Sequence, residues 1–505
     1  MRRNLSIRHQ VLIGVASLLV LASCDSPVDV APIPELVPVS TDSGAVSWTP
    51  LLVADIPGTT VPAPPPADEG MDAVRAAVAG RTSSQQTAIR RWNQGAVQEW
   101  SSVVRSIIAK YNVPPAAERN PDGTFTGRFL PDPAKPLASP VFGARMMALI
   151  EAGTYDGLIH AWRMKYTHKR PAPYQVDPSI ATAAPRTGLP SYPCEDAVAA
   201  RVAVEIIVAF YPGERAAMEA LYAEATQSRV WAGVARPSDL AAGDSLARFV
   251  VGKLKERAAT DKWANADNQV AWRAKEPTIV TSWPRWKCEE FPVRPPLHPF
   301  GGEVLPWNIS SAADVDPGPP PSESDPMFQR DLAEMTDLTK NRTREQVRIA
   351  VYWEAGGGTH GPPGMWMNIA ETQTRNANLS AVRSARILAY VATSLHDAGV
   401  ACWYTKYKYI SARPCTLNDD ITMSAGLPNF PGYTSGHSNF SGASAEVLAH
   451  FFPASGGTFR SMAKEAAESR IYSRIHVRVD CEVGLTQGVN VGKAAVLRAQ
   501  KDAAE

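Results

Sequence analysis

The fold of this chain is decided by three short strings between residues 406 and 480: Lys406 followed by Arg413-Pro414, Ser435-Gly436-His437, and Ser469-Arg470 followed by His476 and Asp480. The lysine and the two arginines supply fixed positive charge, and the guanidinium fork suits tetrahedral oxyanions. Gly436 offers a backbone N–H at a predicted helix start, and helix N-termini attract anions. The strings therefore predict an oxyanion pocket in which two histidines remain for chemistry.

The spacings within the strings predict how the side chains converge. Lys406 and Arg413 are seven residues apart, so one helix face can present both until the next proline ends the helix. His476 and Asp480 are four apart, so on a helix the carboxylate can fix the imidazole tautomer and leave the other ring nitrogen free. Arg470 and His476 are six apart and cannot share a straight helix face, which predicts a break between them.

The three strings stand in a fixed order within 75 residues, a span that one helical bundle can hold. Each string alone has a commonplace explanation, such as a turn for Ser-Gly-His. Together they resemble the superfamily of type-2 phosphatidic acid phosphatases and vanadium-dependent haloperoxidases. The haloperoxidase branch of this superfamily implies duplicated helical bundles.

The resemblance also implies a role for each residue. In a haloperoxidase the cofactor is vanadate and the substrates are hydrogen peroxide and a halide. His476 binds vanadium, His437 handles the protons of peroxide, and Asp480 fixes the imidazole. The oxygens of vanadate are bound by Lys406, Arg413, Ser435, Gly436 and Arg470. The product is hypohalous acid, and we expect bromide and iodide to be oxidised more readily than chloride.

Two other functions stay open from the same residues. In an acid phosphatase, His476 attacks a phosphate monoester to form a phosphohistidine and His437 protonates the leaving alcohol. The third reading is a lipid-anchored scaffold that keeps the pocket without using it. The length and duplication of the chain favour the haloperoxidase, because soluble acid phosphatases are short single bundles and the lipid phosphatases span membranes.

Residues beside the strings bear on the halide. Trp403 and Phe430 match positions near vanadate in fungal chloroperoxidase, so they are candidates for a halide pocket, although aromatics at helical spacing are also common in plain cores. The run from Glu354 to Met365 resembles a haloperoxidase segment that carries an aspartate where this chain has Ala355. That aspartate is a candidate partner for the pocket arginine, so its loss leaves the contact in doubt.

An internal repeat divides the chain. Subtracting 241 from Asp397, Trp403, Lys406, Tyr407, Glu446, Phe451, Pro453, Ser469 and Arg470 gives Asp156, Trp162, Lys165, Tyr166, Glu205, Phe210, Pro212, Ser228 and Arg229. The same shift places Cys194-Glu195-Asp196 where the second copy has Ser-Gly-His, and Ala235 where it has His476. The first copy therefore lacks both histidines and carries acidic groups that repel an oxyanion. It is predicted to be catalytically silent.

Helix-type periodicity runs through both copies, and alternating valine- and isoleucine-rich runs are nearly absent. The fold class predicted is all-α, built from two related helical bundles. The bundles are assigned to residues 71–300, non-catalytic, and 301–505, catalytic. Whether the protein forms a homodimer is left open.

The N-terminus predicts export. Arginines precede an apolar run too short to span a membrane, and the run ends in a lipobox-like Leu21-Ala22-Ser23-Cys24. Residues 1–23 are therefore read as a lipoprotein signal peptide, Cys24 as the lipidated residue, and 24–70 as a proline-rich tether. The expected location is the bacterial cell envelope, on its periplasmic or extracellular face. With 45% hydrophobic residues and a net charge of +1, nothing points to nucleic acid, and membrane contact is expected only through the lipid.

Overall fold

The computed structural model describes residues 33–288 and 293–504. The predicted signal peptide, Cys24 and the start of the predicted tether lie outside the described residues. Residues Leu36–Glu505 form one compact unit, so the predicted boundary between the two bundles stays a prediction. Among the described helices, none has the length and apolar character needed to cross a membrane.

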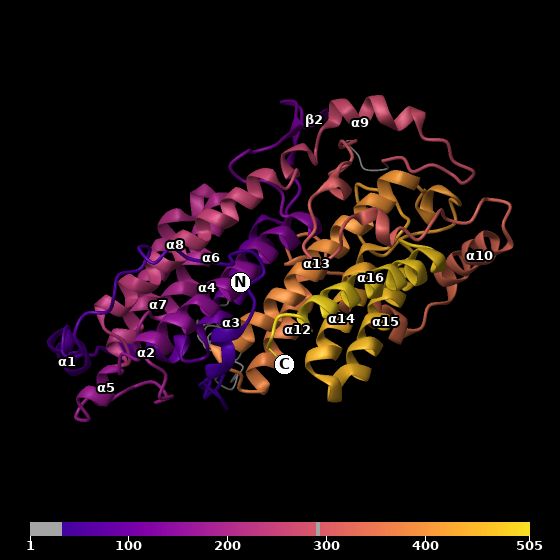
Figure 1. The fold of residues 1–505 in the computed structure, drawn as a ribbon. Helices are drawn as coiled ribbons and strands as arrows, with labels where there is room; N and C mark the ends of the chain where they lie inside the picture. Colours follow the sequence, from indigo (N-terminus) through magenta and orange to yellow (C-terminus); the bar gives the residue numbers. More distant parts are fainter. Residues whose placement is uncertain (1–32, 289–292, 505) are drawn as a thin grey trace, which may run out of the picture. The chain divides into compact units, whose positions relative to one another are not determined.

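The prediction of an all-helical fold is confirmed, and Figure 1 shows the helices in their arrangement. The first half contains α1 Met71–Ala79, α2 Ser83–Trp92, α3 Ala96–Tyr111, α4 Pro140–His168, α5 Pro173–Val176, α6 Glu195–Phe210, α7 Arg215–Trp231, α8 Pro237–Thr260 and α9 Gln269–Lys275. The second half contains α10 Pro326–Asn341, α11 Arg344–Tyr352, α12 Gly361–Asn376, α13 Ala381–Tyr409, α14 Gly436–Phe451, α15 Gly456–Tyr472 and α16 Arg478–Ala499. A small hairpin, β1 Ala116–Arg119 with β2 Phe125–Leu130, lies between α3 and α4.

The predicted duplication is present element by element. The helices α4, α6, α7 and α8 begin at residues 140, 195, 215 and 237, and α13, α14, α15 and α16 begin 241 residues later, at 381, 436, 456 and 478. Ion pairs repeat as well. Arg145 contacts Asp261 at 2.6 Å, and 241 residues later Arg386 contacts Asp502 at 2.8 Å. The two halves therefore share one plan of packing.

The centre of the molecule is the contact between α4 and α13, each 29 residues long. Both helices lie between the helices of the two halves in Figure 1. Most of their side chains are buried on every side, which is typical of a central core helix rather than an amphipathic surface helix. The two halves consequently bury a common core.

Residues 36–70 correct the predicted tether. Trp48 and Val53 are buried, and the backbone N–H groups of Leu51, Leu52 and Val53 donate to the Asp156 carboxylate at 2.6, 2.8 and 2.7 Å. The segment contains only a short 3₁₀ helix, Ser43–Ser47, but its large apolar side chains still enter the core. The segment is a strap fixed to α4 rather than a mobile linker.

A buried carboxylate on the central helix also fixes an irregular segment in the second half. The Asp397 carboxylate on α13 accepts from the backbone N–H groups of Trp307 and Asn308 at 2.7 and 2.6 Å. Burial raises the pKa of Asp156 and of Asp397 to about 6 in both cases, against the opposing effect of these hydrogen bonds. Each central helix thus holds one strap through a buried carboxylate.

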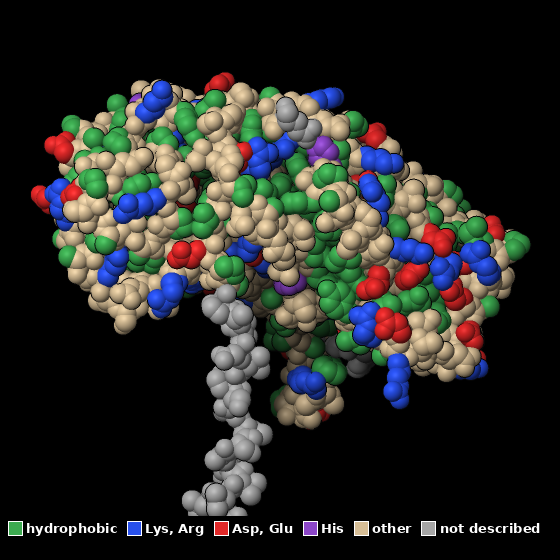
Figure 2. Space-filling view, turned by 90° about the horizontal axis from the view of Figure 1, so that it is seen from below, with side chains coloured by type: hydrophobic (Ala, Val, Ile, Leu, Met, Phe, Trp, Pro, Cys, Tyr) green, Lys and Arg blue, Asp and Glu red, His purple; other side chains and the backbone are tan. Residues whose placement is uncertain are grey.

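On the face drawn in Figure 2, Lys and Arg side chains are interspersed with Asp and Glu. The described residues on this face form no continuous basic patch of the kind that follows a nucleic acid backbone.

Candidate active site

The helix start predicted at Ser435 is confirmed. Ser435 is the N-cap of α14, where its hydroxyl accepts from the Ser438 N–H at 3.4 Å, and Gly436 is the first helical residue. The first N–H groups of a helix have no partner within the helix, so this end carries a partial positive charge. It lies beside the first turn of α16, because the Ser435 N–H donates to the Asp480 carbonyl at 2.9 Å.

Lys406 is fully buried in the last turn of α13. Its ammonium donates to the carbonyls of Pro431 and Gly432 at 2.7 and 2.6 Å. Burial is the main reason that the pKa of Lys406 falls to about 7. The Lys406 amine is therefore only partly protonated at neutral pH. A bound anion would favour its protonated form.

The prediction that Lys406 and Arg413 share one helix face is wrong. The helix α13 ends at Tyr409, and Ile410 has a left-handed backbone with φ of 42°. Arg413 has φ −92° and ψ 152°, as expected for a residue that precedes a proline. The two cations still converge, because the chain turns back after α13 instead of continuing along it.

Arg413 is buried and already contacts the catalytic loop. One terminal nitrogen, Nη1, donates to the Ile475 carbonyl and to Nε2 of His476, both at 2.9 Å. The other, Nη2, donates to the Phe430 carbonyl at 3.1 Å. Its Nε has no hydrogen-bond partner although it is buried. An unpartnered buried donor is costly, so this guanidinium has unused capacity for an acceptor.

His476 and Asp480 form the predicted pair, with 3.0 Å between Nδ1 and Oδ2. His476 itself is not helical, because α16 begins only at Arg478. The predicted break after Arg470 is confirmed, since α15 ends at Tyr472 and Arg474 has φ of 59°. If the imidazole donates from Nδ1 to Asp480, its Nε2 carries the lone pair that the Arg413 contact requires.

His437 and Arg470 form the other side of the site. Nε2 of His437 donates to the Glu354 carbonyl at 3.1 Å, which leaves Nδ1 as an acceptor. Burial, followed by the charge of Arg470, holds the pKa of His437 well below its ordinary value, so the ring is neutral at neutral pH. Arg470 donates to the Ser469 hydroxyl at 2.9 Å and to the Ala350 carbonyl at 3.1 Å. Among the described residues no carboxylate forms an ion pair with Arg470, the contact that Ala355 had left in doubt.

A cavity of about 290 Å³ opens onto these groups. Its lining includes Gly436, His437, Arg470, His476, Trp403 and Phe430. Lys406, Arg413 and Ser435 are not part of the lining and lie behind it, with the Phe430 ring 5.2 Å from the Lys406 ammonium and 5.4 Å from the Arg413 guanidinium. The site therefore consists of an exposed layer with both histidines and a deeper layer of cations.

The aromatic pair predicted as a halide pocket lies in the cavity wall. The rings of Trp403 and Phe430 are 4.8 Å apart between centroids. Sequence reasoning missed the rest of the wall, where the first half contributes Asn112, Leu137 and Ser139. These residues carry no motif, and only the packing of the two halves brings them within reach.

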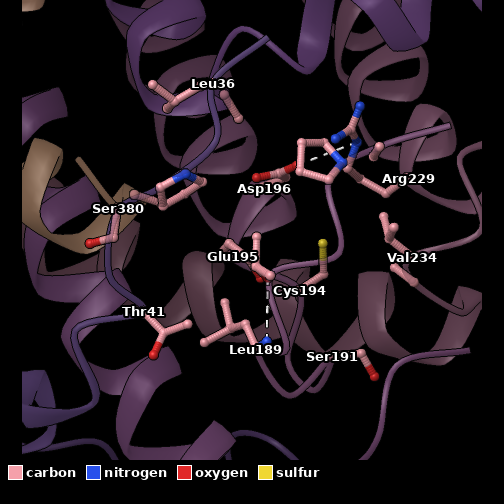
Figure 3. Close-up of a pocket in the computed structure, with 18 of the residues that line it drawn as sticks. Leu36, Thr41, Leu189, Ser191, Cys194, Glu195, Asp196, Arg229, Val234 and Ser380 are labelled. Atoms are coloured by element: carbon pink, nitrogen blue, oxygen red, sulfur yellow. Dashed lines mark hydrogen bonds and ion pairs between the residues drawn. The ribbon is translucent and has the colours of Figure 1, made fainter. Parts of the chain in front are cut away.

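The first half keeps the cations equivalent to those of the active site, but each of them is paired with a carboxylate. Lys165 contacts Glu195 at 2.8 Å, Arg170 contacts Asp239 at 2.8 Å, and Arg229 contacts Asp196 at 3.4 Å. Figure 3 shows Asp196 facing Arg229, with Cys194 and Glu195 beside them. Each cation that would bind an anion is therefore neutralised by a carboxylate.

We expect Lys165→Ala and Arg170→Ala to leave turnover near that of the wild type. Arg170→Ala should be less stable, on the order of 3–5 kcal/mol at most, because it leaves the buried Asp239 without this partner, and Lys165→Ala should lose less because Glu195 is partly exposed. Steady-state rates and chemical denaturation of the folded variants check this. Lys406→Ala is the matched control. If Lys165→Ala lost as much turnover as Lys406→Ala, the first half would have to take part in catalysis.

Comparisons with known proteins agree with this geometry. Residues 385–503 match the family model of the PAP2 superfamily. Among curated proteins, none matches the chain. A bacterial vanadium-dependent iodoperoxidase is similar in structure, with a TM-score of 0.58, 22% identity, and coverage of 80% of this chain and 96% of that one.

Two further solved structures are similar. A holo-type bacterial vanadium-dependent chloroperoxidase has a TM-score of 0.52 at 12% identity and covers 75% of this chain and 96% of its own. The apo-type form has a TM-score of 0.52 at 11% identity, with coverage of 73% and 95%. At these identities the likeness concerns the fold. Residues 385–503, which contain all three strings, match the PAP2 superfamily, and the chain around them has a fold similar to that of the vanadium haloperoxidases.

Proposed function

We propose that the protein is a vanadate-dependent haloperoxidase that oxidises halide with hydrogen peroxide to hypohalous acid. The observation that carries the proposal is the stacked site: two neutral histidines face a cavity, and three buried cations converge behind and beside them. An export signal and a lipid anchor at Cys24, and therefore a location in the cell envelope, remain part of the proposal.

The residues present fit vanadate. Arg413 has a buried Nε without a partner, and the α14 N-terminus points its first N–H groups toward the same region. Lys406, Arg413 and Arg470 oppose two nearby carboxylates, Asp480 and Glu354, so the site has a positive balance suited to an oxyanion. Burial raises the pKa of Asp480 to about 7, so this carboxyl is only partly ionised at neutral pH.

Each residue then has a task. Nε2 of His476 would bind the vanadium, and Asp480 holds the imidazole in the required tautomer. Because Nε2 accepts from Arg413 in the structure, the guanidinium must turn away and offer its donors to the vanadate oxygens instead. When bound, vanadate supplies a Lewis acid that polarises peroxide toward attack by halide.

His437 is the residue that moves protons. Its Nε2 is fixed by the Glu354 carbonyl, so Nδ1 is the free acceptor in a cavity-lining position. Its lowered pKa keeps it ready to accept a proton from peroxide near neutral pH. Trp403 and Phe430 give the wall beside it an apolar character, which excludes water from the path of the halide.

Purification in the presence of vanadate, with vanadium content and halide oxidation measured on the same sample, tests the proposal. Bound vanadium with halide oxidation supports it. Hydrolysis of a phosphate monoester without halide turnover would assign the protein to the phosphatase alternative, in which His476 forms a phosphohistidine. Absence of both activities would favour the third alternative, a lipid-anchored scaffold that keeps the pocket without using it.

We expect iodide and bromide to be oxidised and chloride to be oxidised weakly or not at all. Chloride releases electrons least readily and needs the most strongly polarised peroxide. Phe430 keeps the side of Lys406 and Arg413 apolar, which strengthens their field, but Arg470 lacks a carboxylate to position it. Steady-state rates with the three halides at one peroxide concentration and mildly acidic pH check the order. Chloride turnover equal to bromide turnover would overturn it.

A further inference from the structure

The first half retains a cavity at the position of the active site. It has a volume of about 150 Å³, and its lining includes Cys194, Glu195, Asp196, Arg229 and Ala235. Adding 241 to these numbers gives Ser435, Gly436, His437, Arg470 and His476. The cavity is thus the counterpart of the catalytic one, with different chemistry on its walls.

The charges of this first-half cavity cancel. Lys165 is paired with Glu195, and Arg229 is paired with Asp196. The second half instead sets three cations against two carboxylates, Asp480 and Glu354. A multiply charged oxyanion would therefore find no excess positive charge in the first half. The cavity suits a ligand whose own charges also sum to zero.

Arg229 provides the strongest sign of a ligand. It is 7% exposed, its Nε contacts Ser228 at 3.0 Å and Asp196 at 3.4 Å, and its Nη2 is buried without a hydrogen-bond partner. The equivalent Nη2 of Arg470 donates to the Ala350 carbonyl at 3.1 Å. The first half has lost that acceptor and kept the donor. A ligand carboxylate would satisfy it with a charge-assisted hydrogen bond once the buried guanidinium turns toward the cavity.

The acidic side of the cavity offers the complementary partner. The side chains of Glu195 and Asp196 are 25% and 18% exposed, so both carboxylates are accessible from the cavity. Burial, only partly offset by Arg229, raises the pKa of Asp196 to about 6. A cation beside Asp196 would favour its ionised form. This is the place for an ammonium group.

Polar side chains such as Thr41, Ser191 and Ser380 also line the cavity, but part of its wall is apolar. Trp92, Trp162 and Tyr174 line the cavity together with Leu36 and Leu189. Figure 3 shows Leu36 and Leu189 on either side of the Glu195 and Asp196 pair. A cavity of about 150 Å³ is large enough for a group the size of benzene. The apolar walls therefore suit a small hydrocarbon side chain.

We propose that the first-half cavity binds a small zwitterion, an α-amino acid with an apolar side chain. Its ammonium lies against Asp196, its carboxylate accepts from Nη2 of Arg229, and its side chain packs against the aromatic walls. This binding is independent of vanadate and of halide oxidation, so it stands or falls separately from the proposed function.

Titration calorimetry of the full chain tests the proposal with three related probes: L-leucine, isoamylamine, which lacks the carboxylate, and 4-methylpentanoate, which lacks the ammonium. We expect L-leucine to bind and each of the other two to bind at least roughly tenfold more weakly, because each leaves one charged group unpaired. Equal binding of isoamylamine would overturn the role of Arg229. Binding of inorganic phosphate but not of L-leucine would overturn the zwitterion.

Variants locate the binding site. Asp196→Asn and Arg229→Met should each weaken L-leucine binding by roughly tenfold or more. Ala235→His should abolish it by filling the cavity with the side chain that the fold accepts at His476. If Arg229→Met fails to fold, Asp196→Asn and Ala235→His still decide the question. His437→Ala should leave the affinity unchanged, and a loss of L-leucine binding in that variant would move the site to the catalytic half.

Discussion

His476→Ala is expected to lose both vanadate retention and halide oxidation. The imidazole lines the cavity and is oriented by a carboxylate, at 3.0 Å from Asp480, so its Nε2 is held in position to bind vanadium. Removing it leaves only charges and hydrogen bonds to hold the anion. Arg413 would also lose its acceptor at Nε2, so the deeper layer of the site would rearrange.

Equilibrium dialysis against vanadate, followed by metal analysis, measures the first effect, and bromide oxidation measures the second. His168→Ala is the matched control, since His168 is exposed at the end of α4 and lies outside the cavity. Asp480→Asn gives an intermediate case, because the imidazole stays but its tautomer is no longer fixed. A His476→Ala protein that holds stoichiometric vanadate would exclude His476 as the ligand.

His437→Ala is expected to keep vanadate and to turn over roughly 10²–10⁴ times more slowly, the usual loss for a general acid–base group. His437 contacts the Glu354 carbonyl rather than the cations, so its removal leaves the anion-binding groups in place. The lowered pKa of His437 means that it is neutral at pH 7 and gains its proton only at clearly acidic pH. The wild-type rate should therefore lose its dependence on this group above that range.

A pH profile of turnover in the wild type and in His437→Ala checks this, with vanadium content measured on both. We expect the acidic limb of the wild-type profile to be absent from the variant. Turnover at the wild-type rate would mean that His437 only supports the Glu354 loop. Loss of vanadate together with activity would place the histidine in binding rather than in proton transfer.

The sequence predicted those parts of the site that depend on local chemistry. Ser435 caps a helix because serine hydroxyls accept from the first N–H groups, and His476 reaches Asp480 because the two lie close along the chain. The prediction that Arg413 shares a helix face with Lys406 failed, although the two are seven residues apart. The left-handed backbone at Ile410 ends the helix, and the proline after Arg413 favours an extended backbone.

Contacts between distant segments could not be predicted from the sequence. The strap at Leu51–Val53 is fixed by Asp156, about a hundred residues later, and Ser139 reaches the cavity wall only through packing of the two halves. The unpartnered Nη2 of Arg229 has no sequence signal either, because Arg470 at the equivalent position looks identical. Such features depend on which backbone carbonyl happens to lie nearby.

The contact between α4 and α13 has a consequence for the origin of the chain. These two helices occupy equivalent positions in their halves, and each packs against the other. When the same element of two copies meets itself, the contact has the self-complementary character of an isologous dimer interface. Fusion of two such subunits into one polypeptide would preserve the shared core while releasing one of two identical active sites from selection for catalysis. The core explains why the first half could not be discarded, and the redundancy explains why its cavity was free to change.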